Sequence, residues 1–437
     1  ISNPPPITIV PPADTKQPEV KQGDGGVDFK PSADSIKTEK TADGKTNVTV
    51  TLKSEDLNKA FEALGSNNSG AKTINVNVDQ KGDSTKVNLP AGLLAEKSKT
   101  NKEVVIAISS DDASINIPLQ AVNYDTVAAQ LGVNVADVTL SVSMTAPTAS
   151  EEEAIRNQAK TQKVNVVNVV NFTVTAEGNG KSQEITNFGS TYIPRTIVVS
   201  EQAAGKQYMA VIIDSVTGEL QFIPASVDAK GHIVIMAPHA STYAIVEKSN
   251  VTFSDIRSHW AKSDIEVLAS KLLIQGTSTD TFSPEDKVSR AEFTALIARA
   301  LGLEMLKSDT SFTDVASNGW YAKAIHAAVE AGIIQGRTAT SFAPNATITR
   351  EEMSIMIARA LAFAGSKVDV SAKQTSLLSA FADKAGISTS AQTAVAQAVE
   401  TKIVRGDGKG NFNPKSNATR AEAAVTIKRL LEYLKFI

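Results

Sequence analysis

Apolar side chains recur at helical spacing in three segments of the C-terminal part of this sequence. They occupy every third or fourth position after Arg290, after Arg350 and, less regularly, after Arg420, which predicts three amphipathic helices. The positions are Phe293, Leu296, Ile297, Ala300 and Leu301, then Met353, Met356, Ile357, Ala360 and Leu361, then Ala423, Ile427, Leu430 and Leu431. Each segment is therefore expected to turn one apolar face toward a core.

A capping box stands at the start of each predicted helix. Ser289–Glu292, Thr349–Glu352 and Thr419–Glu422 all place a hydroxyl residue three positions before a glutamate. In a capping box the hydroxyl caps the N3 amide and the glutamate accepts the N–H of the cap residue. Helix formation alone thus explains the hydroxyl residue and the glutamate.

An arginine follows the hydroxyl residue in all three boxes, as Arg290, Arg350 and Arg420. A cation in the first turn opposes the helix dipole and costs roughly a few tenths of a kcal/mol. Its presence in every box asks for a reason beyond helix formation. A guanidinium beside free backbone amides can bind a carboxylate in bidentate fashion, so we predict that these arginines contact a ligand.

Before residue 250 the apolar period changes to two, which is typical of strands. Alternating segments between 45 and 123, together with a helix from Ser54 to Gly65, predict an α+β domain. Residues 124–249 are mostly strand-like, with turns at Gly218 and Gly231, and suggest an antiparallel meander. The expected strands are 48–52, 74–78, 104–108 and 115–119, then 164–174, 208–213, 220–223, 232–236 and 243–246.

The first part of the chain is rich in proline and glycine. Pro4–Pro6, Pro11 and Pro12 are followed by Gly23–Gly26, with few apolar residues at any regular period. Such composition is typical of extended linkers. We therefore predict a linker over 1–44.

A larger unit surrounds the three capping boxes. Gly276, Gly336 and Gly406 each lie 14 residues before the arginine of their box, with a Phe-x-Pro at matching offsets between them. A fixed offset in three copies indicates tandem repeats. The glycines could be helix C-caps before a turn or could leave room for a ligand, and both interpretations stay open.

The three copies resemble S-layer homology (SLH) repeats. The first carries Phe253-Ser254-Asp255-Ile256 before Trp260, and the second carries Phe312-Thr313-Asp314-Val315 before Trp320. The third opens with Phe381-Ala382-Asp383 but has Ser390 where the others have tryptophan. The resemblance covers 251–437, with repeats over 251–310, 311–370 and 371–437, the last of them degenerate.

This resemblance implies both a fold and a function. It implies a multidomain chain in which a β-rich spacer precedes an all-α bundle of short helices with pseudo-threefold symmetry. Its grooves would hold a secreted protein non-covalently on the Gram-positive cell wall, by binding a secondary wall polysaccharide that bears pyruvate ketals. The polymer-binding residues implied are Arg290, Arg350, Arg420, Trp260, Trp320, Gly276, Gly336, Gly406, Glu292, Glu352, Glu422, Asp255, Asp314 and Asp383.

Structural alternatives exist for several of these residues. Trp260 and Trp320 could instead be core plugs of their repeats. The three aspartates precede the first helix of each unit, so N-capping is their simplest explanation. Because the third copy lacks the tryptophan, we expect it mainly to close the bundle, and we expect Arg420 to matter less for binding than the other two arginines.

Composition narrows the function classes. The 437 residues contain no cysteine and carry a net charge of −3, so disulfides and thiolate metal sites are excluded. The four histidines show no metal-ligand spacing and no catalytic motif is present, so we expect neither an enzyme nor a metal or cofactor. No apolar stretch is long enough to span a membrane, and no nucleic-acid partner is expected.

Three hypotheses follow. The leading one is a wall-anchoring protein, and the sequence, which begins at Ile1 without a methionine or a signal peptide, would be the C-terminal portion of a longer secreted chain. The second is a lattice protein of an S-layer, with lattice neighbours as partners. The third is the C-terminal part of a wall-attached carbohydrate-active enzyme.

Overall fold

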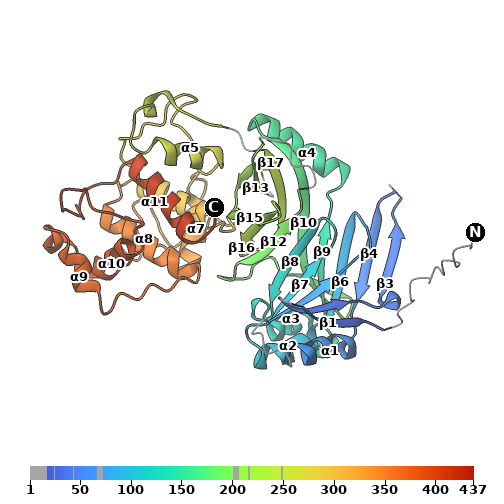
Figure 1. Ribbon diagram of the computed structural model, residues 1–437. Coiled ribbons are helices and arrows are strands. Elements are labelled where there is room, and N and C mark those ends of the chain that lie inside the picture. The colour runs from blue at the N-terminus through green and yellow to red at the C-terminus, as the bar shows by residue number, and fades with distance from the viewer. Residues whose placement is uncertain are drawn as a thin grey trace, which may run out of the picture. The chain divides into compact units, whose positions relative to one another are not determined.

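The computed structural model describes residues 17–23, 25–42, 44–65, 72–199, 206–214, 217–247 and 250–437. These residues divide into two compact units: unit 1 comprises the chain up to 146 and residues 173–185, and unit 2 comprises 147–172 and 186–437. The chain is multidomain, with a β-rich N-terminal region and helices toward the C-terminus (Figure 1), as predicted. The division does not follow the predicted ranges 45–123 and 124–249, because the chain crosses between the units within strand β10 (Asn165–Gly178).

Unit 1 contains two rows of hydrogen-bonded strands, β1-β2-β5-β7-β8 and β3-β4-β6-β9. The pairs β2–β5, β5–β7 and β4–β6 are parallel and the others are antiparallel. The elements are β1 (Glu19–Gly23), β2 (Gly26–Lys30), β3 (Ile36–Lys40), β4 (Thr46–Thr51), α1 (Ser54–Gly65), β5 (Thr73–Asn77), β6 (Ser84–Pro90), α2 (Ala91–Thr100), β7 (Val105–Ser109), β8 (Ala113–Pro118), α3 (Tyr124–Leu131), β9 (Thr139–Thr145) and β11 (Lys181–Glu184). This mixture of helices and strands agrees with the predicted α+β character.

Alternation of apolar and polar residues produces these strands. Ile74 and Val76 of β5 are fully buried while their neighbours along the strand are half exposed. Successive side chains of a strand point to opposite faces, so one face of β5 enters the core. Helix α1 has the predicted bounds and buries Leu57 and Phe61, one turn apart.

The predicted linker over 1–44 is wrong for residues 19–40, which form β1, β2 and β3. Val27 and Phe29 of β2 are fully buried and pair in parallel with β5. The glycines near 23–26 serve a hairpin: Gly23 pairs with Gly26, and a Cβ on Gly26 would lie 2.1 Å from the carbonyl oxygen of Thr73. Residues 1–16 lie outside the described part of the chain.

In unit 2 the antiparallel strands are shared between two rows. Strand β13 (Tyr208–Ile213) pairs with β14 (Leu220–Phe222) and β17 (Thr242–Glu247), and β17 also pairs with the first part of β10. Strand β16 (Ile233–Ala237) pairs with β12 (Ile193–Ile197) and β15 (Ala225–Val227). Strands β10, β13, β14, β16 and β17 were thus predicted, whereas β12 and β15 were not. The predicted meander is wrong, because the chain changes row after β14 and returns at β17. Helix α4 (Ala149–Thr161) packs Ile155 and Ala159 against the row that contains β13.

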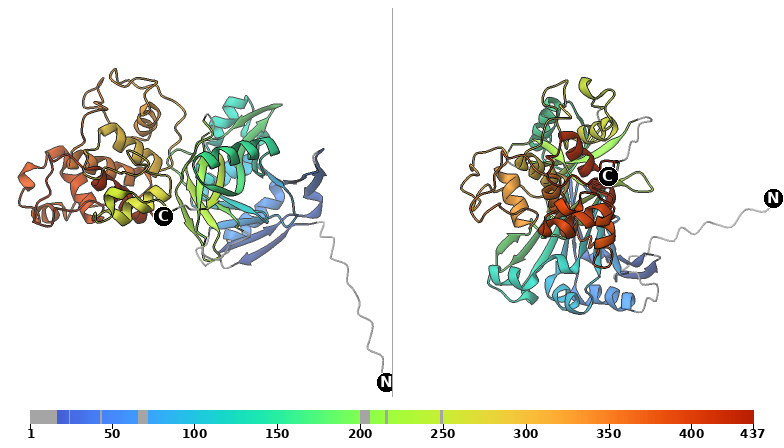
Figure 2. Two further views of the ribbon diagram at one scale, coloured as in Figure 1. Left: turned by 90° about the horizontal axis from the view of Figure 1, so that it is seen from above. Right: turned by 90° about the vertical axis from the view of Figure 1, so that its left-hand side faces the viewer.

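The helical segment of unit 2 follows directly (Figure 2). Its α-helices are α5 (Lys262–Ser270), α6 (Arg290–Ala300), α7 (Ala322–Glu330), α8 (Arg350–Phe363), α9 (Gln374–Ser379), α10 (Gln392–Glu400) and α11 (Arg420–Tyr433). The second helix of each repeat packs on the first helix of the next: α6 on α7, α8 on α10, and α11 back on α5. One hydrophobic core runs through all three repeats. Among the described helices, none has the length and apolar character needed to cross a membrane.

Within unit 2 the strands pack directly against the helical segment. The Tyr192 hydroxyl donates to the carbonyl of Leu301 at 2.8 Å, and its ring lies 4.8 Å from that of Phe436. Gly302, which ends α6 with a φ of +60°, faces Ile223 and Pro224. This close approach of backbone to side chains requires a residue without a Cβ.

We predict that Gly302→Ala destabilises unit 2 more than Gly365→Ala. Both glycines follow a helix with positive φ, so each substitution incurs the left-handed penalty of about 1–2 kcal/mol. A Cβ at Gly302 would also lie 2.6 Å from Ile223 Cδ1, whereas nothing lies within 4 Å at Gly365, and such overpacking costs about 1–3 kcal/mol more. Urea unfolding of the full chain, followed by circular dichroism, measures the difference. Equal losses in the two variants would contradict a tight contact at Gly302.

Candidate functional site

The three predicted capping boxes are present at the starts of α6, α8 and α11. In the first, the Ser289 hydroxyl accepts the Glu292 N–H at 3.1 Å, and Glu292 accepts the Ser289 N–H at 2.7 Å. Thr349 with Glu352 and Thr419 with Glu422 make the same pair of bonds. One carboxylate oxygen of each glutamate is thereby committed to its own helix.

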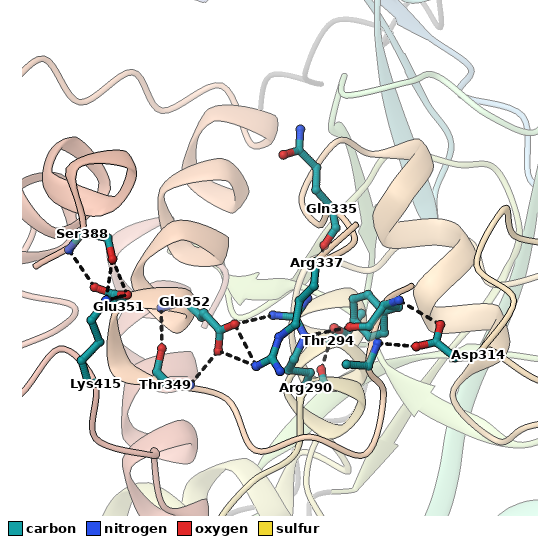
Figure 3. A network of polar contacts seen from close by, with 12 residues as sticks. Arg290, Thr294, Asp314, Gln335, Arg337, Thr349, Glu351, Glu352, Ser388 and Lys415 are labelled. Carbon is teal, nitrogen blue, oxygen red and sulfur yellow. Dashed lines mark hydrogen bonds and ion pairs between the residues drawn. The ribbon is translucent and has the colours of Figure 1, made fainter. Parts of the chain in front are cut away.

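The arginine of each box reaches into the neighbouring repeat, and Figure 3 shows this for Arg290. Arg290 donates from Nε to the carbonyl of Phe342 at 3.0 Å and from Nη2 to that of Gln335 at 3.3 Å. Its Nη1 lies 3.1 Å from Glu352, and its guanidinium lies 4.7 Å from the centre of the Phe342 ring. Arg290 is only 5% exposed, and burial lowers its pKa against the opposing effect of Glu352.

The other two arginines repeat this arrangement around a cycle. Arg350 of the second repeat binds the carbonyls of Phe412 and Arg405 and the carboxylate of Glu422 at 2.7 Å. Arg420 of the third repeat returns to the first, at the carbonyls of Phe282 and Gln275, with Glu292 at 3.9 Å. Helix formation alone does not explain a cation at the start of each helix. The contacts that the three arginines make with the neighbouring repeat do explain it.

The aspartates are not the helix N-caps that we expected. Asp255 accepts the N–H groups of Phe282 and Ser283 at 2.9 and 2.7 Å, in the Phe-x-Pro loop of the same repeat. The residue after each phenylalanine has a positive φ, as at Ser283. Desolvation raises the pKa of Asp255, but these hydrogen bonds outweigh it and leave the pKa below its usual value. Asp314 and Asp383 bind the equivalent loops in the same way.

The repeated glycines are not C-caps. Helix α5 ends at Ser270, six residues before Gly276. A Cβ on Gly276 would lie 2.4 Å from the carbonyl oxygen of Ser278 and 2.6 Å from the ring of Phe253. Gly336 and Gly406 meet the equivalent backbone and phenylalanine in their own repeats. These glycines are required by close packing inside the loop that the arginine contacts.

Trp260 and Trp320 are both 63% exposed, so the alternative of a core plug is wrong for both. Trp260 lines a cavity of about 510 Å³ together with Arg350, Gly406, Glu422 and Arg429, which we call groove B. Trp320 lines a cavity of about 350 Å³ with Gly276, Glu292, Arg299 and Arg420, which we call groove A.

Each groove combines three repeats. Groove A takes its glycine and glutamate from repeat 1, its tryptophan from repeat 2 and its box arginine from repeat 3. Groove B takes them from repeats 3, 1 and 2. The reason given for ranking Arg420 below the other two arginines therefore does not hold, because Arg420 lines groove A with Trp320, whereas Arg290 lines neither groove.

The third combination in this cyclic order, which we call position C, would consist of Gly336, Glu352 and Arg290, with Ser390 in place of the tryptophan. Here Arg337 Nη2 lies 3.1 Å from Glu352 Oε1, so this carboxylate holds two guanidinium groups (Figure 3). Nearby, Glu351 accepts the N–H and hydroxyl of Ser388 at 3.0 and 2.9 Å and pairs with Lys415. Internal partners thus occupy Glu352 and Glu351, the two carboxylates at and near position C.

A second arginine of each groove was missed by the sequence argument. Arg299, Arg359 and Arg429 each follow the box arginine by nine residues. Arg299 and Arg429 line grooves A and B, and Arg359 donates to the Gln335 side chain at 2.9 Å. Their fixed offset was available as a signal, but they stand among the apolar positions of the helices and were not singled out. Among the described residues, no group of His, Asp and Glu side chains could hold a metal ion.

The sequence model of the S-layer homology domain matches residues 252–294, 311–354 and 380–424. The chain carries three S-layer homology domains. It is similar to an amylopullulanase of Thermoanaerobacterium thermosulfurigenes, 33% identical over 88% of this chain and 19% of that protein. It is also similar to an exoglucanase of Acetivibrio thermocellus, 42% identical over 43% of this chain and 17% of that protein, and to a surface-layer 125 kDa protein of Lysinibacillus sphaericus, 35% identical over 40% and 14%.

The chain spans about a fifth or less of the length of these relatives. The match with the amylopullulanase is too long to be confined to the SLH domains, so it includes much of the region before residue 251. The three SLH domains and the similarity to surface-layer proteins indicate where the chain is found. It is a secreted protein of the cell surface, attached to the cell wall.

We predict that Arg350→Ala lowers the free energy of unfolding by about 2–4 kcal/mol, because it leaves Glu422 and two carbonyl groups without their donor. Arg405→Ala is the control, since its side chain is exposed and the loss should stay within about 0.5 kcal/mol. Denaturant unfolding of the full chain measures both. Similar stability of the two variants would mean that the links between repeats contribute little.

Proposed function

We propose that the SLH domains bind a pyruvylated secondary cell-wall polysaccharide in grooves A and B, and so anchor the protein on the wall. The observation that supports this most strongly is the presence of an exposed tryptophan in each of the two grooves, with two arginines in groove A and three in groove B. A pyruvate ketal presents a carboxylate next to an apolar sugar face, which is the complement of such a pair.

The tryptophans suit the sugar. An indole that is 63% exposed has a large apolar face that gains from covering the C–H groups of a ring. Neither face is needed for the core, since each cavity is open beside it. This arrangement orients a sugar without demanding a particular set of hydroxyl groups.

The arginines suit the carboxylate in two different ways. Arg350 already donates three hydrogen bonds within the protein, which leaves two of its five N–H groups. In groove A, the side chain of Arg299 has no hydrogen bond or ion pair to another described residue, and burial lowers its pKa although Glu219 partly offsets this. We propose that Arg299 and Arg429 bind the anion, while the box arginines mainly shape the groove and add a supporting charge.

We further propose that the three domains form a pseudo-threefold bundle. The packing of α6 on α7, α8 on α10 and α11 on α5 supports this, as does the cycle of bridges from Ser289 to Thr347, Thr349 to Asn417 and Lys287 to Thr419. In such a bundle the glutamates, aspartates and repeated glycines act on the polymer only indirectly, by holding the groove walls.

A second candidate function is attachment of a carbohydrate-active enzyme. The long match with an amylopullulanase favours it, because it includes much of the region before residue 251. We propose that the chain serves as anchor and spacer and is not itself catalytic; assays on a panel of wall and plant polysaccharides test this, and hydrolysis by the chain would contradict it. Assembly into an ordered lattice on a surface would instead favour the S-layer alternative.

We predict that Trp260→Ala and Trp320→Ala each weaken binding to purified walls. Loss of a stacking face should cost about 1–2 kcal/mol, or roughly five- to thirtyfold in affinity for a fragment that fills one groove. The double variant should lose most binding, while Tyr433→Ala removes an exposed aromatic that lines neither groove and serves as the control. Wild-type affinity in the double variant would exclude both grooves.

We predict that removal of pyruvate from the polymer weakens binding by tenfold or more, since a charge-assisted hydrogen bond contributes about 1.5–3 kcal/mol. Isothermal titration with intact and depyruvylated polymer from the same preparation measures this. Equal affinity for the two polymers would show that neutral sugar contacts dominate and that the arginines do not bind the ketal.

A further inference from the structure

Groove B contains a cation that groove A lacks. Arg405 precedes Gly406, at the position that Gln275 and Gln335 occupy in the other repeats. Its backbone carbonyl accepts from Arg350 at 2.6 Å, as the equivalent glutamine carbonyls accept from their arginines. The side chain of Arg405 is not needed for that contact, and it is exposed and lines the groove.

The Arg405 side chain has no internal anion to bind. Within residues 250–437 and the rest of the described chain, neither Arg405 nor Arg429 has a carboxylate at ion-pair distance. Arg405 and Arg429 both line groove B. After burial, the charge on Arg405 is the next cause that lowers the pKa of Arg429, and Asp264 and Glu432 partly offset it. Like charges in proximity cost free energy that a bound anion would recover.

The acidic residues of groove B are already committed. Glu422 binds Arg350 at 2.7 Å and the Thr419 N–H at 2.8 Å. Asp407 accepts the N–H groups of Lys409 and Asn411 at 2.8 and 3.0 Å, inside its own turn, and Glu285 lies 2.8 Å from His259. Formal charge does not separate the grooves, since the residues lining each carry one net positive charge; the difference lies in which cations lack a partner.

We propose that Arg405 forms a second anion subsite in groove B, beside the Arg429 that binds the ketal carboxylate, and that this subsite takes a second acidic group on the same polymer segment. This rests on the proposed function of the groove and deepens it. Groove A has Gln275 at this position and takes one acidic group only. The second group is a phosphate or a further carboxylate, because both offer the paired oxygens that guanidinium groups bind.

The grooves are tested one at a time in the full chain. Trp320→Ala disables groove A and leaves groove B, and Trp260→Ala does the reverse. Arg405→Gln is then added to the first background, which installs the residue that the other two repeats carry. Gln275→Arg is added to the second background, which gives groove A the cation that it lacks. Unchanged unfolding midpoints confirm that the variants remain folded.

Three probes are titrated calorimetrically against each variant at low and high salt. One is the methyl glycoside of a pyruvate-ketal hexosamine, with a single carboxylate. The second is the same sugar with a phosphomonoester, and the third is a disaccharide with the ketal and a uronic acid. The second and third probes separate the two sources of the second charge.

Arg405→Gln should weaken one of the dianionic probes about tenfold and flatten its salt dependence, with less than twofold change for the monoanionic probe. Gln275→Arg should strengthen the same probe in groove A. An equal loss of affinity for all probes would overturn the second subsite, because Arg405 would then act on the ketal carboxylate. Unchanged affinity for every probe would also overturn it. The proposed function itself fails if neither the wild-type protein nor the Trp320→Ala variant binds any of the probes or the polymer.

Discussion

The helical part of this protein depends on a guanidinium that crosses from one repeat to the next. Arg290, Arg350 and Arg420 each donate to two carbonyl groups of the following repeat and lie over its phenylalanine ring. A cation in the first turn of a helix is unfavourable by itself, but these carbonyls and the glutamate of the next capping box surround it with negative potential. The three links form a closed cycle, so each repeat is held from both sides and the third is held by the first.

The helices and the strands of unit 2 also approach each other closely, at the end of helix α6. Gly302 lets the end of α6 lie against Ile223, and the Nε2 atom of His239 lies 2.9 Å from the Gly302 carbonyl. Because a carbonyl only accepts, this nitrogen must carry the proton, and burial together with the charge of Arg195 lowers the pKa of His239 to about 4. The ring is therefore neutral at physiological pH. Unit 2 thus combines the three SLH domains with a β segment that packs directly against them.

Local patterns in the sequence predicted what local interactions determine. The capping boxes, the second helix of each repeat and helix α1 come from contacts within a few residues, and alternation along the chain marks many of the strands although their partners are distant. The predictions that were wrong involve contacts between residues far apart in the sequence. Asp255 binds a loop 27 residues away, and Arg420 binds a carbonyl 145 residues away. No spacing rule says which copy a side chain reaches, so the grooves could not be assembled from the repeats one by one. The predicted linker is wrong for residues 19–40 because glycines are common both in linkers and in hairpins such as the one that pairs Gly23 with Gly26.

Comparison of the three copies with one another separates the scaffold from the recognition surface. The positions that hold the repeats together are the same in all copies. They are the arginine and glutamate of the capping box, the aspartate that binds the Phe-x-Pro loop, and the glycine that precedes this Phe-x-Pro. Two exposed positions differ between the copies, with tryptophan, tryptophan and serine at 260, 320 and 390, and glutamine, glutamine and arginine at 275, 335 and 405, whereas the second arginine at 299, 359 and 429 is shared. A closed cycle tolerates such changes because each exposed side chain belongs to one groove, whereas a buried link supports two repeats at once. Three copies of one fold can therefore carry grooves with different chemistry.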